Sequence, residues 1–142
     1  MRVLLVEDSD DDILLTTEAL ESGKLQVDLH VVKTGTDAMA YLRCEGRYAD
    51  ALRPELILLD LNLPGIDGRE VLRRVKDDPH LHTIPVVVMT TSRAEEDVEM
   101  AYGLHANCYV TKPVGLDAFI EIVHSIEDFW LTVVRLPNGE RP

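Results

Sequence analysis

Short apolar runs alternate along the chain with longer segments in which apolar residues recur every three or four positions. Runs of the first kind predict strands, and segments of the second kind predict amphipathic helices. The expected strands are Arg2–Val6, Val27–Val32, Leu56–Leu59, Pro85–Met89 and Cys108–Thr111. The third and fourth runs are apolar at almost every position, which is typical of strands covered by helices on both faces.

Helices are expected between these strands and after the last one. They begin at Ser9 or Asp10, Thr34, Asp67, Glu95 and Gly115, and the last helix continues to about Trp130. Ser9 or Asp10 and Asp67 suit such starts, because their side-chain oxygens accept hydrogen bonds from free backbone N–H groups. Five strands alternating with five helices predict an α/β fold, a doubly wound five-stranded parallel sheet.

This alternation fills most of the chain. Residues 1–131 are expected to form one domain, followed by a C-terminal tail over residues 132–142. Pro137 and Asn138-Gly139 disfavour a regular helix in that tail. No internal repeat and no linker to a second domain is visible in the sequence.

The composition favours a folded acidic protein. Hydrophobic residues make up 46% of the chain, which is enough for a core. The 14 basic and 26 acidic side chains give a net charge of -12, which argues against nucleic acid or an anionic membrane as a partner. Cys44 and Cys108 lie far apart, and neither a signal peptide nor a membrane span occurs. We therefore expect a cytoplasmic protein with reduced thiols.

Polar residues follow four of the five expected strands. These residues are Glu7 and Asp8 after the first strand, Asp60 after the third, Thr90 after the fourth and Lys112 after the fifth. Taken singly, each has an ordinary explanation as a helix cap, a turn former or a surface lysine. In a parallel sheet, however, they share the carboxyl edge, where open α/β folds bind ligands. The neighbouring Asp10, Asp11 and Asp12 are expected to be a solvated helix start.

The chemistry of this set points to a cation and a phosphoryl group. Three carboxylates close together repel one another, and oxygen ligands without His or Cys favour Mg²⁺. A lysine and a hydroxyl beside such a site can hold phosphoryl oxygens by charge and by hydrogen bond. A carboxylate such as that of Asp60 can accept a phosphoryl group, while Mg²⁺ offsets the repulsion between the two.

On these residues the chain resembles the receiver domains of two-component response regulators. The resemblance rests on Val6-Glu7-Asp8, Leu59-Asp60, Pro64-Gly65, Asp67-Gly68, Thr90 and Tyr109-Val110-Thr111-Lys112-Pro113. It covers about residues 1–130 and implies a flavodoxin-like fold. Tyr48-Ala49-Asp50, Arg53-Pro54 and Phe129-Trp130 resemble, more narrowly, single-domain regulators paired with phytochrome-type histidine kinases.

The resemblance implies a role for each site residue. Asp60 is expected to be the phospho-acceptor. Glu7 and Asp8 are expected to bind Mg²⁺ together with Asp60 and the backbone carbonyl of Asn62, with Asp8 the more direct ligand.

The resemblance also implies a switch. Lys112 is expected to hold a phosphoryl oxygen, and Thr90 to move towards the phosphoryl group. Tyr109 is then expected to rotate inward, and the Lys112–Pro113 peptide bond to be cis.

The implied function is a phosphorylation switch without substrate turnover. A sensor histidine kinase, of the phytochrome type on the narrower resemblance, donates the phosphoryl group. The surface of the fourth helix, fifth strand and fifth helix then changes for partner binding, homodimerisation or phosphorelay. The last helix has a wide apolar arc, and we expect Ile122, Phe129 and Trp130 to lie in such an interface. The alternative for this arc is a broad core face covered by the tail.

Two other functions are compatible with parts of the pattern. A Mg²⁺-dependent phosphatase with an aspartyl nucleophile, resembling the haloacid dehalogenase family, places a DxD motif on its first strand. Here that strand ends in Glu7-Asp8, and the candidate nucleophile follows the third strand. A receiver-like interaction module that is never phosphorylated is expected to lack an acidic or lysine position, and none is missing here.

Overall fold

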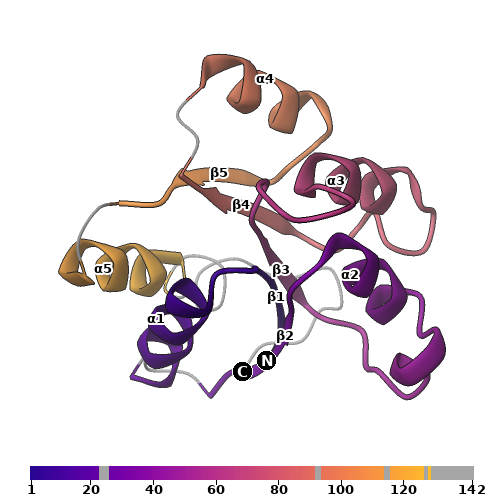
Figure 1. Ribbon diagram of the computed structural model, residues 1–142, viewed down its shortest axis with the longest axis horizontal. Coiled ribbons are helices and arrows are strands. Elements are labelled where there is room, and N and C mark those ends of the chain that lie inside the picture. Colours follow the sequence, from indigo (N-terminus) through magenta and orange to yellow (C-terminus); the bar gives the residue numbers. More distant parts are fainter. Residues whose placement is uncertain (23–25, 92–93, 114–115, 127, 129–142) are drawn as a thin grey trace.

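The computed structural model describes residues 1–22, 26–91, 94–113, 116–126 and 128 (Figure 1). Its strands are β1 (Arg2–Val6), β2 (Asp28–Val32), β3 (Leu56–Leu59), β4 (Val86–Thr90) and β5 (Cys108–Thr111). Its helices are α1 (Asp10–Glu21), α2 (Gly35–Leu42), the short 3-10 helix η1 (Gly46–Tyr48), α3 (Gly68–Asp77), α4 (Glu95–Gly103) and α5 (Leu116–Ile126). The predicted strands are correct to within one residue at each end.

The five strands form one parallel sheet in the order β2-β1-β3-β4-β5. Helices α1 and α5 cover one face of the sheet, and α2, α3 and α4 cover the other (Figure 1). This arrangement confirms the doubly wound α/β prediction. All five strand carboxyl ends therefore lie along one edge of the sheet.

The core has two layers because successive residues of the central strands point to opposite faces. Leu4 and Leu59 lie on the face covered by α2, α3 and α4, whereas Leu5 and Leu58 lie on the face covered by α1 and α5. Burying each such side chain stabilises the fold by about 1.5–3 kcal/mol. The buried sheet is thus a rigid support for the polar residues at its edge.

Two predicted capping residues stabilise the starts of the helices that follow β1 and β3. The side chain of Ser9 accepts a hydrogen bond from the backbone N–H of Asp12 at the start of α1. At the start of α3, the Asp67 side chain accepts from the N–H groups of Arg69 and Glu70. Both predictions of a capping residue are confirmed.

Some expectations are corrected or lie outside the described residues. The Lys112–Pro113 bond is trans, the lower-energy form of an X–Pro peptide bond, so the expectation of a cis bond is wrong. The loop after α2 contains η1, which the sequence did not predict. The expected domain boundary at residue 131 and the tail fall outside the described residues. In the described part of the chain, every helix is too short or too polar to cross a membrane.

Candidate functional site

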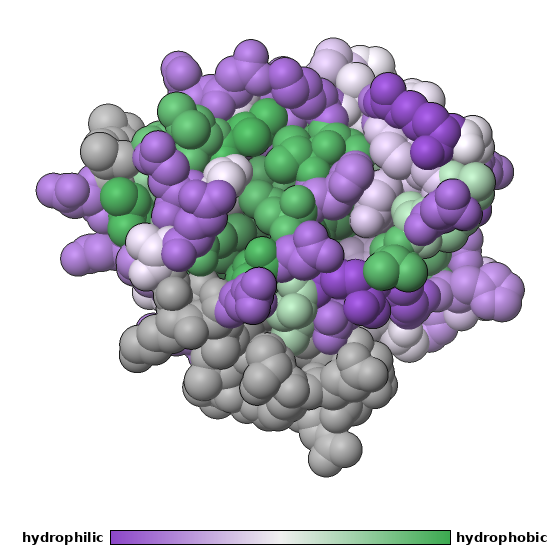
Figure 2. Space-filling model, turned by 90° about the horizontal axis from the view of Figure 1, so that it is seen from below, coloured by the Kyte–Doolittle hydropathy of each residue, from purple (hydrophilic) through white to green (hydrophobic). Residues whose placement is uncertain are grey.

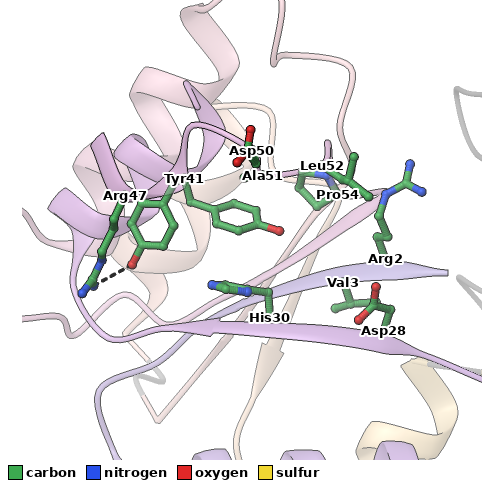
Figure 3. Close-up of a pocket in the computed structure, with 11 residues that line it drawn as sticks. Arg2, Val3, Asp28, His30, Tyr41, Arg47, Asp50, Ala51, Leu52 and Pro54 are labelled. Carbon is green, nitrogen blue, oxygen red and sulfur yellow. Dashed lines mark hydrogen bonds between the residues drawn. The ribbon is translucent and has the colours of Figure 1, made fainter. Parts of the chain in front are cut away.

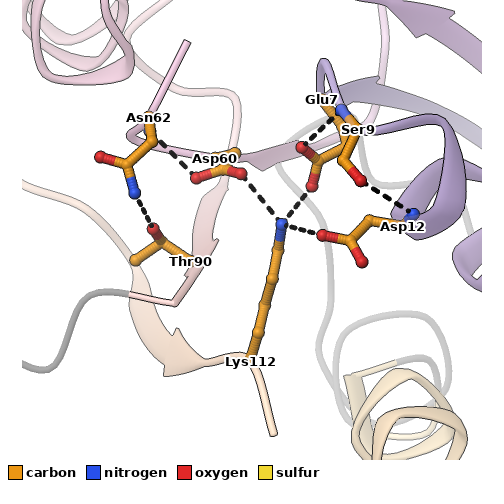
Figure 4. Close-up of polar contacts among 7 residues, drawn as sticks. All are labelled: Glu7, Ser9, Asp12, Asp60, Asn62, Thr90 and Lys112. Carbon is orange, nitrogen blue, oxygen red and sulfur yellow. Dashed lines mark hydrogen bonds and ion pairs between the residues drawn. The ribbon is translucent and has the colours of Figure 1, made fainter. Parts of the chain in front are cut away.

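Two of the predicted polar residues, Glu7 and Asp60, converge on Lys112 at the carboxyl edge of the sheet (Figure 4). Its Nζ lies 2.9 Å from Oδ2 of Asp60 and also binds Oε1 of Glu7. These side chains come from the ends of β5, β3 and β1, so three separate segments of the chain meet at one ammonium group. The predicted convergence of Glu7, Asp60 and Lys112 is confirmed.

A further carboxylate, that of Asp12, also belongs to this cluster. Its Oδ2 lies 2.7 Å from Nζ of Lys112 (Figure 4). Asp12 was expected to be part of a solvated helix start, and for this residue the expectation is wrong. The first turn of α1 begins directly after β1, and this places Asp12 over the edge of the sheet. By contrast, Asp10 pairs with Lys33 on the surface.

Three carboxylates form a potential site for a divalent cation. One oxygen each of Glu7, Asp8 and Asp60 lies within 4.8 Å of the others. Glu7 and Asp60 are buried, with 2% and 7% of their surface exposed, whereas Asp8 is exposed. A hard ion such as Mg²⁺ prefers carboxylate oxygens and keeps water on its open side. One solvent-facing and two buried carboxylates suit that kind of coordination.

Asn62 organises the chain after β3 around Asp60. Its backbone N–H donates to Oδ1 of Asp60 at 3.0 Å, and its Nδ2 donates to Oγ1 of Thr90 at 3.4 Å (Figure 4). The role of its carbonyl as a metal ligand stays a prediction. Thr90 is fully buried at the end of β4, which pairs with β3, the strand that Asp60 follows. A hydroxyl therefore lies on the side of Asp60 that faces β4.

The surroundings shift the pKa values of the buried groups. Burial raises the pKa of Asp60, but the Asn62 N–H and the Lys112 ammonium outweigh it and hold this pKa below its usual value. Burial raises the pKa of Glu7 to about 7, although Lys112 opposes the change. Burial lowers the pKa of Lys112, but the carboxylates of Asp12, Glu7 and Asp60 outweigh it and raise this pKa above its usual value. Asp60 is thus ionised beside a permanent positive charge.

Two further predicted residues, Tyr109 and Ile122, take part in the two core layers. Tyr109 on β5 is half-buried and packs against the core layer of α2, α3 and α4. Ile122 on α5 is half-buried against the other layer, so part of it contributes to the core. Phe129 and Trp130 lie outside the described residues. The predicted interface therefore stays a prediction.

Comparison with known proteins identifies the family. Residues 3–124 match the model of the response regulator receiver domain. The chain belongs to this family. It is 50% identical over 135 residues to the response regulator Rcp1 of Synechocystis sp., which covers 95% of this chain and 92% of that protein.

Two solved receiver structures share the fold closely. The phosphorylated cyanobacterial phytochrome response regulator RcpA has 52% identity and a TM-score of 0.93, covering 96% of this chain and 97% of that one. The Mn²⁺-bound form of Rcp1 has 49% identity and a TM-score of 0.93, covering 96% and 98%. The family and fold agree with the receiver prediction rather than with the haloacid dehalogenase alternative. The Rcp1 structure contains a divalent metal, and this receiver has an acidic cluster of Glu7, Asp8 and Asp60 that suits one.

Proposed function

We propose that this receiver accepts a phosphoryl group on Asp60 from the phosphohistidine of a sensor histidine kinase. The observation that carries the proposal is the environment of Asp60. Its carboxylate is buried and ionised, and it lies 2.9 Å from the Lys112 ammonium beside two further carboxylates, Glu7 and Asp8. An ionised carboxylate held next to a cation pocket is a competent phosphoryl acceptor.

The transfer forms one bond and breaks another. An oxygen of Asp60 forms a bond to phosphorus as the bond to the donor imidazole nitrogen breaks, and the imidazole keeps that electron pair. Glu7, Asp8 and Asp60 would hold Mg²⁺, which supplies positive charge that offsets the repulsion between the carboxylate and the phosphoryl oxygens. Lys112 is already bound to Asp60 and can pair with a phosphoryl oxygen in the product.

The acyl phosphate then acts on Thr90 and its neighbours. The Thr90 hydroxyl donates to a phosphoryl oxygen, and its movement alters the end of β4. The backbone N–H of Lys112 donates to the Thr90 carbonyl at 2.7 Å, which links this movement to β5. Tyr109 on β5 then turns inward. Phosphorylation thereby shifts the population between two packings of the α4, β5 and α5 surface.

The readout in this proposal is a protein surface. A domain over residues 1–131 and a tail over 132–142 together present α4, β5 and α5 to a partner, a second copy or a phosphorelay. Ile122, Phe129 and Trp130 form part of the dimer contact. The likeness to RcpA, a cyanobacterial phytochrome response regulator, supports a phytochrome-type kinase as the donor. Unpaired Cys44 and Cys108 fit the reducing cytoplasm, where such a kinase domain acts.

Phosphotransfer from a radiolabelled kinase tests the assignment of Asp60. The full chain should gain a label that is stable to acid but lost in hydroxylamine, as expected for an acyl phosphate. Asp60→Asn should gain no label, because an amide cannot accept the phosphoryl group, while the exposed-site control Asp77→Asn should match the wild type. Persistent label in Asp60→Asn would show that another residue is the acceptor.

A further inference from the structure

Strand β2 has an open edge in the described part of the chain, where it pairs with β1 alone. The N–H of Asp28 donates to the Met1 carbonyl at 2.7 Å, and the Val32 carbonyl accepts from the N–H of Glu7 at 3.0 Å. Because alternate residues of a paired strand bond to opposite sides, Leu29 and Val31 turn their N–H and C=O groups away from β1. Such an edge is a template for another strand.

A hollow with aromatic walls lies on one side of this edge. It has a volume of about 280 Å³ and opens between β2, α2 and the loop after η1 (Figure 3). The rings of His30 and Tyr41 stack with centroids 4.4 Å apart, and Tyr48 meets Tyr41 edge-on at 5.4 Å. The faces of tyrosine rings attract cations, and the Arg47 guanidinium already lies over the Tyr48 ring, 4.9 Å from its centroid.

The charges around this hollow leave two carboxylates available. Within the described residues, Asp28 and Asp50 line the hollow without forming an ion pair. Two arginines, Arg2 and Arg47, also line the hollow. Arg47 pairs with Asp37 at 3.2 Å, and Nε of Arg2 donates to the Arg53 carbonyl at 2.8 Å. The Arg2 bond is to a neutral backbone carbonyl, so Arg2 keeps its charge beside the hollow. Two carboxylates against this one arginine leave the hollow with a net negative charge, which suits a positively charged side chain from outside.

A second hollow lies on the opposite side of the same strand. It has a volume of about 370 Å³, and its apolar lining is Leu20 of α1 with Val27, Leu29 and Val31. Figure 2 views the molecule from below Figure 1, towards the β2 edge, and shows apolar side chains gathered in one patch. Leu29 and Val31 are only half-buried there. This hollow suits aliphatic side chains.

We propose that the β2 edge docks an extended basic segment of a partner protein, which adds to the sheet beside Leu29 and Val31. Side chains of an added strand point alternately to the two faces, so arginine or lysine enters the aromatic hollow while aliphatic residues enter the apolar one. The net charge of -12 attracts a basic segment and opposes pairing with a second copy. This docking does not require phosphorylation of Asp60.

Three short synthetic peptides test the proposal on the full-length, ¹⁵N-labelled chain. One alternates valine and arginine, the second alternates valine and glutamate, and the third is the first with alternate backbone nitrogens methylated. The valine–arginine peptide should shift the amide signals of Leu29 and Val31 and slow their hydrogen exchange. The other two should bind at least about tenfold more weakly, since they lack the charge or the backbone donors.

Variants of the chain test whether the carboxylates of Asp28 and Asp50 contribute to peptide binding. The double variant Asp28→Asn/Asp50→Asn should bind the valine–arginine peptide about tenfold more weakly, as two lost charge contacts imply. Asp77→Asn, which removes an exposed carboxylate at the end of α3, should bind it as the wild type does. Signals distant from β2 should be unchanged in both variants, which shows that they remain folded. Equal affinity of the double variant and the control would overturn the charge assignment.

Other outcomes would overturn the docking site itself. Shifts confined to α4 and α5 would place the peptide on another surface, and an absence of shifts would remove the site. Slow exchange of Leu29 and Val31 in the free chain at every concentration would mean that another segment of the same chain covers the edge. Protection that grows with protein concentration would identify the occupant as a second copy.

Discussion

Lys112 is a buried cation that binds three carboxylates, and its positive charge compensates their negative charges. Only 6% of its surface is exposed. A buried charge is tolerated when it is paired, and the removal of one partner leaves the others uncompensated. Glu7, Asp12 and Asp60 would be left uncompensated in this way if the ammonium were lost.

Replacing Lys112 with methionine should therefore destabilise the metal-free protein strongly. We expect Lys112→Met to lower the free energy of unfolding by about 3 kcal/mol, because the buried carboxylates lose their shared counter-charge. Urea unfolding in EDTA measures this change. The control is Lys33→Met, whose partner Asp10 is 81% exposed and whose loss should cost less than about 1 kcal/mol. Similar losses in the two variants would contradict the account of Lys112.

The sequence predicted the residues at strand ends but missed Asp12. Glu7, Asp60 and Lys112 could be predicted because a residue directly after a parallel strand must lie at the carboxyl edge. The position of Asp12 depends on how α1 packs over that edge, and the hydrophobic pattern of a helix does not specify this for its first turn. The expectation of a cis bond at Lys112–Pro113 failed for another reason, since it came from the family resemblance rather than from local chemistry.

At the scale of elements, the start of α3 is fitted closely against the end of β3. A Cβ atom on Gly68 would lie 2.1 Å from the backbone carbonyl oxygen of Asp60 and 2.6 Å from Cα of Leu61. Both contacts are with backbone, so neither can be relieved by a side-chain movement. The absence of a side chain at Gly68 thus allows α3 to support the phospho-acceptor loop.

The variant Gly68→Ala should disturb both stability and phosphotransfer. We expect a loss of about 1–3 kcal/mol in the free energy of unfolding, because α3 must move away from β3. The labelling rate of Asp60 should fall as well, since its backbone is the contact that shifts. Gly103→Ala is the matched control, because a Cβ there meets nothing within 4 Å. Thermal unfolding and phosphotransfer assays that show equal effects in the two variants would refute this packing argument.

At the amino ends of the strands, opposite the carboxyl edge, a polar network that the sequence did not reveal joins neighbouring elements. The Asn107 side-chain oxygen accepts from the backbone N–H of Val86 at 2.8 Å and from Nζ of Lys76 at 3.1 Å. Lys76 also donates to the Ile84 carbonyl at 3.0 Å. These contacts join the end of α3 to the starts of β4 and β5. Side-chain contacts between distant segments of this kind leave no periodic signal in a sequence.

Removing the Asn107 amide should weaken the fold without affecting the chemistry. Asn107→Ala leaves the N–H of Val86 without its acceptor, so we expect a loss of about 1–3 kcal/mol in the free energy of unfolding. At a temperature where the variant stays folded, its rate of phosphoryl transfer should equal that of the wild type, because the site lies at the carboxyl ends of the strands. A slower transfer in the folded variant would mean that the Asn107 network influences the phospho-acceptor site.

At the scale of the whole molecule, the fold was predicted well because every level of the sequence agrees on it. Apolar runs, caps and the polar residues after the strands all indicate the same alternating α/β order. The hollows beside β2 could not be predicted, because they arise where α1, α2 and the loop containing η1 pack against an edge strand. The net charge of -12 adds a repulsion that acts on the entire domain.

This charge makes the effect of magnesium a test of the complete site. Any salt should stabilise the protein somewhat by screening, whereas Mg²⁺ bound by Glu7, Asp8 and Asp60 should stabilise it further, by about 2.7 kcal/mol at a hundredfold excess over its dissociation constant. Thermal unfolding in MgCl₂ and in NaCl of equal ionic strength separates the two effects. Asp8→Asn should lose the extra stabilisation by Mg²⁺. It should keep the metal-free fold, because Asp8 is exposed. The control variant Asp11→Asn, which changes an exposed neighbour, should keep the extra stabilisation by Mg²⁺. If Asp8→Asn responds to Mg²⁺ as Asp11→Asn does, the metal lies elsewhere.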